Sequence, residues 1–238
     1  MILKEADLYL PIKRYFEGIG YAVNGEVKGC DVVLTKGDET AIVELKKTFN
    51  ISLVYQLIDR QKAANAVYAA IPRQAFAKKR RQILHIMEKL NCGLITVAMD
   101  SPVKTVAVHL VPAPAKARNS ARSRALAAEV VGRNFDGNIG GTSGQKLLTA
   151  HRERAIYAAC ALSEVGSAKP MDLVKKFGCD KYIGQMLRRD YYGWFERLDK
   201  GLYALSAAGA DALKDAQFAE VVAYYQNLAR ERAGEDDV

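Results

Sequence analysis

Two acidic residues and a lysine stand in a stretch whose other residues are typical of β-strands. Residues 26–47 read EVKGCDVVLTKGDETAIVELKK. Asp31 and Glu44 fall in two runs that alternate with a period of two, and Lys46 follows Glu44 by two residues. That spacing puts Glu44 and Lys46 on the same face of a strand. Two carboxylates beside a lysine could hold a divalent cation and stabilise charge on a phosphate.

The turn between the two runs sets which residues face each other. Gly37-Asp38 suits a two-residue II′ hairpin loop, and that register places Asp31 opposite Glu44. Their Cβ atoms would lie about 5 Å apart, where like charges destabilise a sheet. Lys46 would compensate in part, and a bound cation would add more. A small cluster of hard oxygen ligands suits Mg²⁺ or Mn²⁺ better than zinc. Alternatively, the acids lie on a solvated face and Lys46 pairs with Glu44 by chance.

The order of these residues resembles the D…(D/E)-x-K signature of the PD-(D/E)XK nuclease-like superfamily. A wider set, over about the first 110 residues, is similar to an uncharacterised bacterial family of PD-(D/E)XK phosphodiesterases. That set comprises Glu5, Leu8-Tyr9, Pro11, Gly20-Tyr21, Glu26, Gly29-Cys30-Asp31-Val32-Val33, Val43-Glu44-Leu45-Lys46 and Asp59-Arg60. Cys30 stands where the superfamily usually has a proline before the acid.

The resemblance implies a restriction-endonuclease-like fold, with a mixed β-sheet flanked by helices, and metal-dependent phosphodiester hydrolysis. It implies Asp31 and Glu44 as metal ligands and Lys46 as a catalytic residue. It also implies Glu5, from the first helix, and a polar residue of the next helix, Gln56 or Arg60, beside the metal.

Each of these further assignments has a simpler alternative. Glu5 could be a surface acid favoured near a helix N-terminus. Glu26 could lie at the rim of the acidic cluster, with no defined role. Asp59 could form a surface ion pair with a neighbour on its helix.

The periodicity of the first 112 residues predicts an α/β sandwich with a mixed sheet. A helix over residues 3–18, bent or delayed by Pro11, precedes strands at 21–27 and in the hairpin. The pattern continues with a helix at 52–64 capped by Ser52, a strand at 67–71 and a helix at 75–90. It ends with a strand at 94–99 and an edge strand at 105–111. The basic run at 78–81 fits a solvated face or a phosphate contact.

Composition favours a polyanionic partner. The chain has 238 residues, a net charge of +8 and a pI of about 9.2, which fit nucleic acid but also a membrane surface or the ribosome. We expect a cytoplasmic protein with no membrane association, because charges interrupt the first ten residues and no long apolar run follows. The four cysteines lack metal-site spacing, so we expect buried free thiols.

The sequence predicts three parts: a nuclease-like domain over residues 1–112, a basic flexible linker over 113–145 and a second domain over 146–238. The linker is rich in Ala, Arg, Ser and Gly, with a central part that could be helical and a mobile stretch at 137–144. It could follow a nucleic-acid backbone or serve only as a solubilising spacer.

Three helices and a hairpin around Asp199-Lys200-Gly201 resemble a winged helix-turn-helix. In the third helix, expected from Asp180 to Arg189, the apolar residues Ile183, Met186 and Leu187 would face the core. The candidates for nucleic-acid contact are Lys181, Tyr182, Gln185, Arg188, Arg189 and Lys200. Such side chains suit phosphates and base edges in a major groove, although a winged helix could instead bind protein.

We therefore expect a Mg²⁺- or Mn²⁺-dependent nuclease acting on nucleic acid, with double-stranded DNA favoured and a homodimer possible. The alternative is a non-enzymatic DNA-binding regulator whose nuclease-like domain is silent. A third reading is a nuclease that acts on RNA, because the motif recognises phosphate and metal rather than the sugar.

Overall fold

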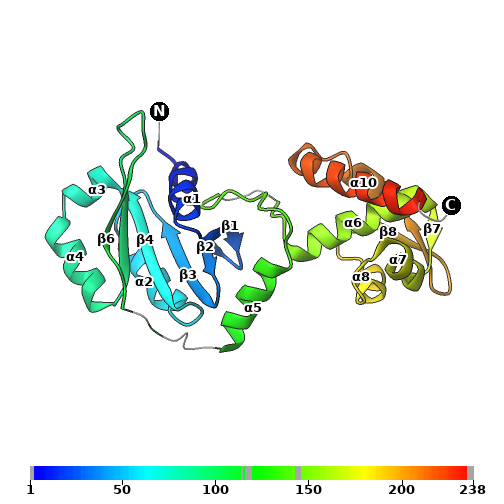
Figure 1. Ribbon diagram of the computed structural model, residues 1–238, viewed down its shortest axis with the longest axis horizontal. Helices are drawn as coiled ribbons and strands as arrows, with labels where there is room; N and C mark the ends of the chain where they lie inside the picture. The colour runs from blue at the N-terminus through cyan, green and yellow to red at the C-terminus, as the bar shows by residue number, and fades with distance from the viewer. Residues whose placement is uncertain (1–2, 114, 116–119, 143–145, 235–238) are drawn as a thin grey trace. The chain divides into compact units, whose positions relative to one another are not determined.

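The computed structural model describes residues 3–113, 115, 120–142 and 146–234 (Figure 1). The chain divides into two compact units, Met1–Leu147 and Leu148–Val238. Across the described residues, every helix is too short or too polar to serve as a membrane span. The four cysteines are free and buried, as expected.

The first unit is built on one six-stranded sheet in the order β1-β2-β3-β4-β5-β6. The strands are β1 (Ala22–Val27), β2 (Cys30–Lys36), β3 (Glu39–Leu45), β4 (Ala66–Pro72), β5 (Gly93–Val97) and β6 (Val106–Leu110). The pairs β3–β4 and β4–β5 are parallel, and the other three neighbouring pairs are antiparallel. The predicted mixed sheet is therefore confirmed, with β6 at its edge.

Helices cover both faces of this sheet, so its central strands are buried on both sides (Figure 1). One face packs on the 3₁₀ turn η1 (Glu5–Leu8) and on α1 (Tyr9–Gly18). The other packs on α2 (Ile51–Arg60), α3 (Arg73–Ala77), α4 (Arg80–Lys89) and α5 (Ser120–Val131). Removing apolar area from water on both faces is the main stabilising term, at roughly 25 cal/mol per Å².

The β2–β3 hairpin has the predicted register. Val32 pairs with Val43 and Lys36 with Glu39, which leaves a two-residue loop. Gly37 adopts a φ of +56° there, a conformation that glycine takes without strain. Val33 and Ile42 belong to the core on the α2 side, and the alternate residues Val32, Leu34, Ala41 and Val43 belong to the core on the α1 side.

Several predicted helix boundaries were wrong. The first helix begins as a 3₁₀ turn and becomes α-helical only at Tyr9, so Pro11 lies in the first turn, where a backbone N–H has no helical partner. The cap of α2 is Asn50, whose side chain accepts from the Leu53 N–H at 2.9 Å, and not Ser52. The first helix ends at Gly18, so Ile19 lies beyond it and is 47% exposed.

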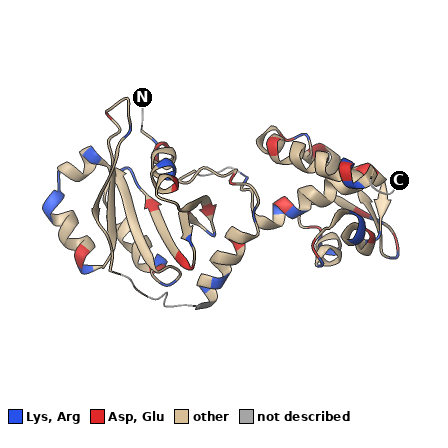
Figure 2. Cartoon of the chain, viewed as in Figure 1, with Lys and Arg blue, Asp and Glu red and all other residues tan. Residues whose placement is uncertain are grey.

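The predicted helix at 75–90 is two helices, because Lys79 leaves the helical conformation, with a φ of −136° and a ψ of 31°. The basic run at 78–81 spans this junction and is exposed, as expected of a solvated face. Basic residues are visible along α3 and α4 in Figure 2.

The predicted flexible linker is largely part of the first unit. Leu126 of α5 is buried against the sheet, and Arg122 donates to Asp59 at 3.1 Å. Beyond α5, residues 133–142, here called the strap, bind backbone and side chains of α1 and β1. Of the stretch predicted to be mobile, residues 143 and 144 lie outside the described residues. Composition alone suggested flexibility, whereas specific polar anchors bind this segment.

The second unit combines helices with a three-stranded sheet in the order β7-β9-β8. Its elements are α6 (Ala150–Val165), β7 (Ser167–Ala168), α7 (Pro170–Phe177), α8 (Ile183–Arg189), β8 (Phe195–Asp199), β9 (Leu202–Leu205), α9 (Ala207–Ala212), η2 (Ala216–Phe218) and α10 (Ala219–Gly234). The predicted hairpin is present. The third helix is shorter than predicted, since it starts at Ile183 and Asp180 only precedes it with a turn.

Candidate active site

Asp31 and Glu44 lie side by side where β2 and β3 meet at the end of their ladder. They adjoin the paired residues Val32 and Val43. Asp31 Oδ2 accepts from the Leu45 N–H at 2.8 Å, which fixes this carboxylate against β3. Glu44 is fully buried. By strand alternation both side chains point to the α2 side of the sheet.

The cation in contact with Glu44 is Arg60, so the chance pairing of Lys46 with Glu44 considered above is not the arrangement found. Arg60 Nε lies 2.6 Å from Glu44 Oε1, and Arg60 Nη2 donates to the Gly29 carbonyl at 2.5 Å. Lys46 Nζ instead lies 3.2 Å from Glu5 Oε2. Glu5 thus reaches the cluster from η1, and each of the two bases neutralises one acid.

Burial and mutual repulsion control the charge on the paired carboxyls. Burial, followed by the neighbouring Asp31 charge, raises the pKa of Glu44 to about 7, against the lowering effect of Arg60 and Lys46. Burial also raises the pKa of Asp31, although the Leu45 N–H and Lys46 oppose this. Among the described atoms, Glu44 Oε2 is buried with no hydrogen-bond partner. One oxygen of a costly buried carboxylate is thus available to a ligand.

Glu26 joins the same acidic cluster. It is 8% exposed, and its backbone has a φ of +50°, which is uncommon for a residue with a side chain. Its Oε1 accepts from the Thr142 N–H of the strap at 3.1 Å. Burial and the Asp31 charge raise the pKa of Glu26. The strap therefore stabilises a strained residue beside the paired acids.

The strap is anchored by two ionic side chains. The buried Arg133 donates to the Gly25 and Glu26 carbonyls, each at 3.0 Å. Asp136 accepts from the Tyr9 hydroxyl at 2.9 Å and from the Gly25 N–H at 3.0 Å, and it also pairs with Lys13.

Between these anchors and the acids the backbone passes very close to β2. A Cβ atom on Gly140 would come within 2.3 Å of the Asp31 carbonyl oxygen. Only glycine allows this approach, so the strap forms one wall of the site.

Gln56 lies on α2, one turn before Arg60. Its Oε1 is buried and has no hydrogen-bond partner among the described atoms. The structure thus places Gln56 on the helix that lines the cluster, with a polar atom still available. Asp59 faces outward and pairs with Lys62 and Arg122, which is the surface alternative considered for it.

The residues are compatible with a magnesium or manganese ion. Among the described residues, no three His, Cys, Asp or Glu side chains converge as a ready-made metal cage. Mg²⁺ needs no such cage, because it keeps several waters and commonly binds one or two carboxylates together with substrate phosphate. Asp31 and the unpartnered Glu44 Oε2 provide that kind of donor set.

In the second unit, the six side chains proposed for nucleic-acid contact are all exposed. Ile183 and Leu187 are buried beneath them, and Met186 is partly buried. The amphipathic division expected for this helix is therefore present. Its exposed face is basic and includes Arg188 and Arg189.

Fold and cluster together define a mixed α/β protein with a six-stranded mixed sheet flanked by helices, consistent with a PD-(D/E)XK-like fold. The model of a family described as "Putative PD-(D/E)XK phosphodiesterase (DUF2161)" matches residues 95–212. This segment is just under half of the chain and contains the strap, but it begins after Asp31, Glu44 and Lys46 and includes none of them.

Similarity to individual proteins is limited. No curated protein matches the chain. A solved structure of a protein of unknown function from Silicibacter pomeroyi is 14% identical, with a TM-score of 0.38. The matched region covers 53% of this chain and 84% of the Silicibacter chain.

Sequence reasoning missed the anchors of the strap and ranked Arg60 too low. Arg133 and Asp136 lie more than a hundred residues from the β1 groups they bind, so neither spacing nor periodicity connects them to that strand.

Proposed function

We propose that this protein is a Mg²⁺- or Mn²⁺-dependent nuclease that hydrolyses phosphodiester bonds in nucleic acid, with double-stranded DNA as its favoured substrate. The observation that carries the proposal is the pairing of Asp31 with Glu44, whose buried Oε2 has no partner among the described atoms. A pair of repelling, desolvated carboxylates costs stability. A bound cation would offset that cost, and the family description supports the same class of reaction.

Asp31 and Glu44 would hold the metal ion. When bound, it would supply Lewis-acid stabilisation of phosphate charge and an activated water. Arg60 keeps Glu44 oriented through Oε1 and favours its ionised form. The Leu45 N–H does the same for Asp31.

Lys46 would act on the substrate. Its side chain is 17% exposed and its ammonium is held by Glu5, so the group is positioned but not sealed from solvent. An ammonium there would stabilise negative charge as it develops on the scissile phosphate. Glu5 would thus be a positioning residue for Lys46.

The second unit would hold the nucleic acid as a winged helix-turn-helix. In support of this, α8 and the turn before it present Lys181, Tyr182, Gln185, Arg188 and Arg189, and the β8–β9 turn presents Lys200. These side chains would contact phosphates and base edges. We propose that this unit gives affinity while the first unit gives cleavage.

Cleavage assays test the proposal. Wild-type protein and a Lys46→Ala variant are incubated with single-stranded and double-stranded DNA and RNA, each with Mn²⁺, with Mg²⁺ and with EDTA. We expect metal-dependent cleavage that the variant loses without losing its fold. Lys89→Ala, at an exposed position on α4, is the matched control and should cleave normally. Wild-type rates from Lys46→Ala, in preparations free of contaminating nuclease, would contradict the proposal.

The alternative, a DNA-binding regulator with a silent first unit, predicts binding without cleavage under every metal condition. A nuclease acting on RNA predicts cleavage of the RNA probes alone. The same assay therefore distinguishes all three functions.

A further inference from the structure

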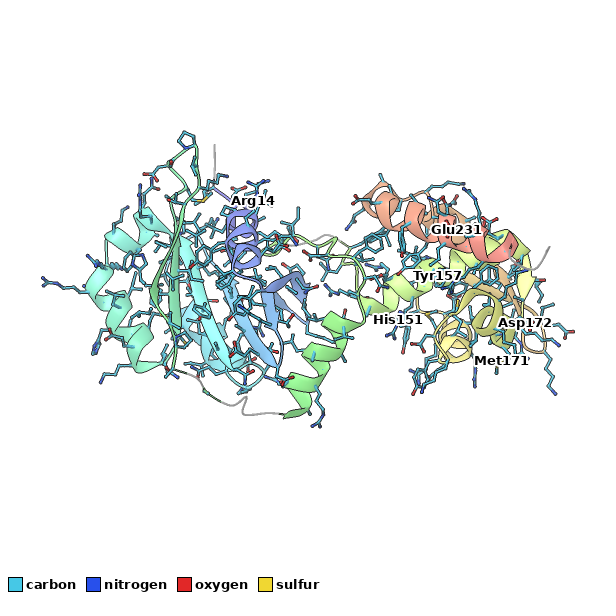
Figure 3. The ribbon with its side chains drawn as sticks, in the orientation of Figure 1. Arg14, His151, Tyr157, Met171, Asp172 and Glu231 are labelled. Carbon is cyan, nitrogen blue, oxygen red and sulfur yellow. The ribbon has the colours of Figure 1, made fainter. Side chains whose placement is uncertain are left out.

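The second unit contains a cavity of about 150 Å³ that the proposed cleavage site does not use. It opens between α6, the loop before α8, and α8 itself. Its lining includes His151 and Tyr157 from α6, Cys179 and Tyr182 from the loop, Gln185 from α8 and Tyr191 beyond it. Figure 3 shows His151 and Tyr157 on α6, the helix that provides one wall.

The floor of the cavity is apolar and neutral. Ile183 is buried, and burial raises the pKa of the Cys179 thiol to about 12, so it stays protonated. The Tyr157 hydroxyl donates to the Phe177 carbonyl and accepts from Arg232. The polar atom of this ring is therefore already satisfied, and the floor offers surface for packing.

The rim is aromatic and basic. Tyr182 and Tyr191 are 62% and 67% exposed, which is high for large side chains with an apolar ring. The Tyr191 ring lies edge-on to His151, with centroids 5.4 Å apart, and its hydroxyl lies 3.4 Å from Arg189 Nη1. Both contacts hold the ring at the opening.

We propose that this cavity binds one unpaired nucleobase of a nucleic-acid strand. Ligand pockets for whole drug-sized molecules usually measure about 300–1,000 Å³, so a smaller cavity suits a single ring system. Exposed tyrosines stack on bases of any sequence, and neighbouring arginines hold the backbone. The Gln185 amide, which can donate and accept, could pair with a base edge.

Charge selects a nucleotide over an apolar peptide side chain. The rim carries Arg154 and Arg189, with Lys181 and Arg188 beside it, against a single acid, Asp180. Asp180 lies 3.7 Å from Arg154 and neutralises that arginine in part. The remaining excess of positive charge complements phosphate.

This inference deepens the proposed function and rests on it for the substrate class, nucleic acid, but not for metal binding or cleavage. A base enters such a cavity from a single strand, or after it is flipped out of a duplex. The cavity therefore predicts that double-stranded DNA is bound most tightly at sites where a base is unpaired or is easily flipped out of the duplex.

The test measures binding of the full-length protein in EDTA, where metal-dependent cleavage is absent. The probes are a fluorescein-labelled single-stranded DNA of about 12 nucleotides, the same strand with abasic sites, and the blunt duplex. The variants are Tyr182→Ala with Tyr191→Ala, and the matching pair of Phe substitutions. Tyr224→Ala, on α10 outside the cavity and 51% exposed, is the control.

We expect the alanine pair to bind the intact strand about tenfold more weakly. The phenylalanine pair should keep most of the affinity, because it retains the stacking rings and loses only the hydroxyls, and Tyr224→Ala should bind normally. Wild-type protein should bind the abasic strand as weakly as the alanine pair binds the intact strand. Equal affinity of wild-type protein for intact and abasic strands would overturn the inference, even if the alanine variants did not fold. Base-dependent binding without any cleavage would instead contradict only the proposed function.

Discussion

Arg60 Nε lies 2.6 Å from Oε1 of Glu44, a carboxylate with no exposed side-chain surface. This contact joins α2 to the end of β3 and leaves Glu44 Oε2 without a partner among the described atoms. The guanidinium also donates to the Gly29 carbonyl. One arginine therefore fixes the carboxylate and the loop before Asp31 at the same time.

Removing Arg60 should destabilise the protein through Glu44. Breaking one side of a buried ion pair leaves an unpaired charge, so Arg60→Ala at pH 8 should lower the free energy of unfolding by about 3 kcal/mol. In a Glu44→Gln background the same substitution should cost much less. Urea unfolding of the two single variants and the double variant measures the coupling.

Arg122→Ala provides the matched control. Arg122 pairs with Asp59 at 3.1 Å but is 52% exposed, so its loss should change stability by less than about 1 kcal/mol. If Arg60→Ala had an equal effect in both Glu44 backgrounds, the ion pair would not be the cause.

Glu44→Gln should change how stability depends on pH. The folded pKa of Glu44 is raised from an ordinary 4.5 to about 7. A raised folded pKa contributes stability that is fully present below about pH 4.5 and is lost as the pH rises through about 7.

In EDTA, raising the pH from 5 to 8 should lower the free energy of unfolding of wild-type protein but not that of Glu44→Gln. The difference between the two proteins should therefore shift in favour of the variant by on the order of 2 kcal/mol. Thermal unfolding at both pH values checks the sign. A constant difference across this range would show that Glu44 titrates normally in the folded protein.

Manganese should stabilise the protein through the two paired acids. A ligand that binds only the folded state at 100 times its dissociation constant adds about 2.7 kcal/mol, so saturating Mn²⁺ should raise the melting temperature and EDTA should reverse the shift. Asp31→Asn should abolish this gain. Asp100→Asn, at an exposed residue that pairs with Arg73, should retain it.

Gly140→Ala should displace Asp31 by direct contact. The added Cβ would lie 2.3 Å from the Asp31 carbonyl and 2.8 Å from Tyr9 Cδ2, so β2 or the strap must move, at a cost of about 1–3 kcal/mol. We expect lower thermal stability and a smaller Mn²⁺ effect. Gly18→Ala, where a Cβ would meet nothing within 4 Å, should be neutral on both measurements.

The local elements of the first unit were predictable because they depend on short-range patterns. Alternation over residues 30–45 predicted the hairpin, and a two-residue loop at Gly37-Asp38 predicted the pairing that the structure has. The apolar period of residues 183–187 likewise predicted which side of α8 is buried.

Capping and helix breaks were less predictable. Asn50 and Ser52 are both suitable caps by residue type, and only the position of the Leu53 N–H distinguishes them. The break at Lys79 has no proline or glycine to mark it. The position of a cap or of a helix break depends on how the helix packs against the sheet, and the types of the local residues do not reveal that packing.

The sequence by itself determined that Asp31, Glu44 and Lys46 lie at one end of a two-stranded ladder, because register in a tight hairpin follows from neighbouring residues. Tertiary structure alone decided which base serves which acid: Arg60 pairs with Glu44 and Lys46 with Glu5. It also folded the strap over Glu26 and Asp31. Such contacts join residues far apart in the chain, so the packing of α2, η1 and the strap decides them and local pattern does not.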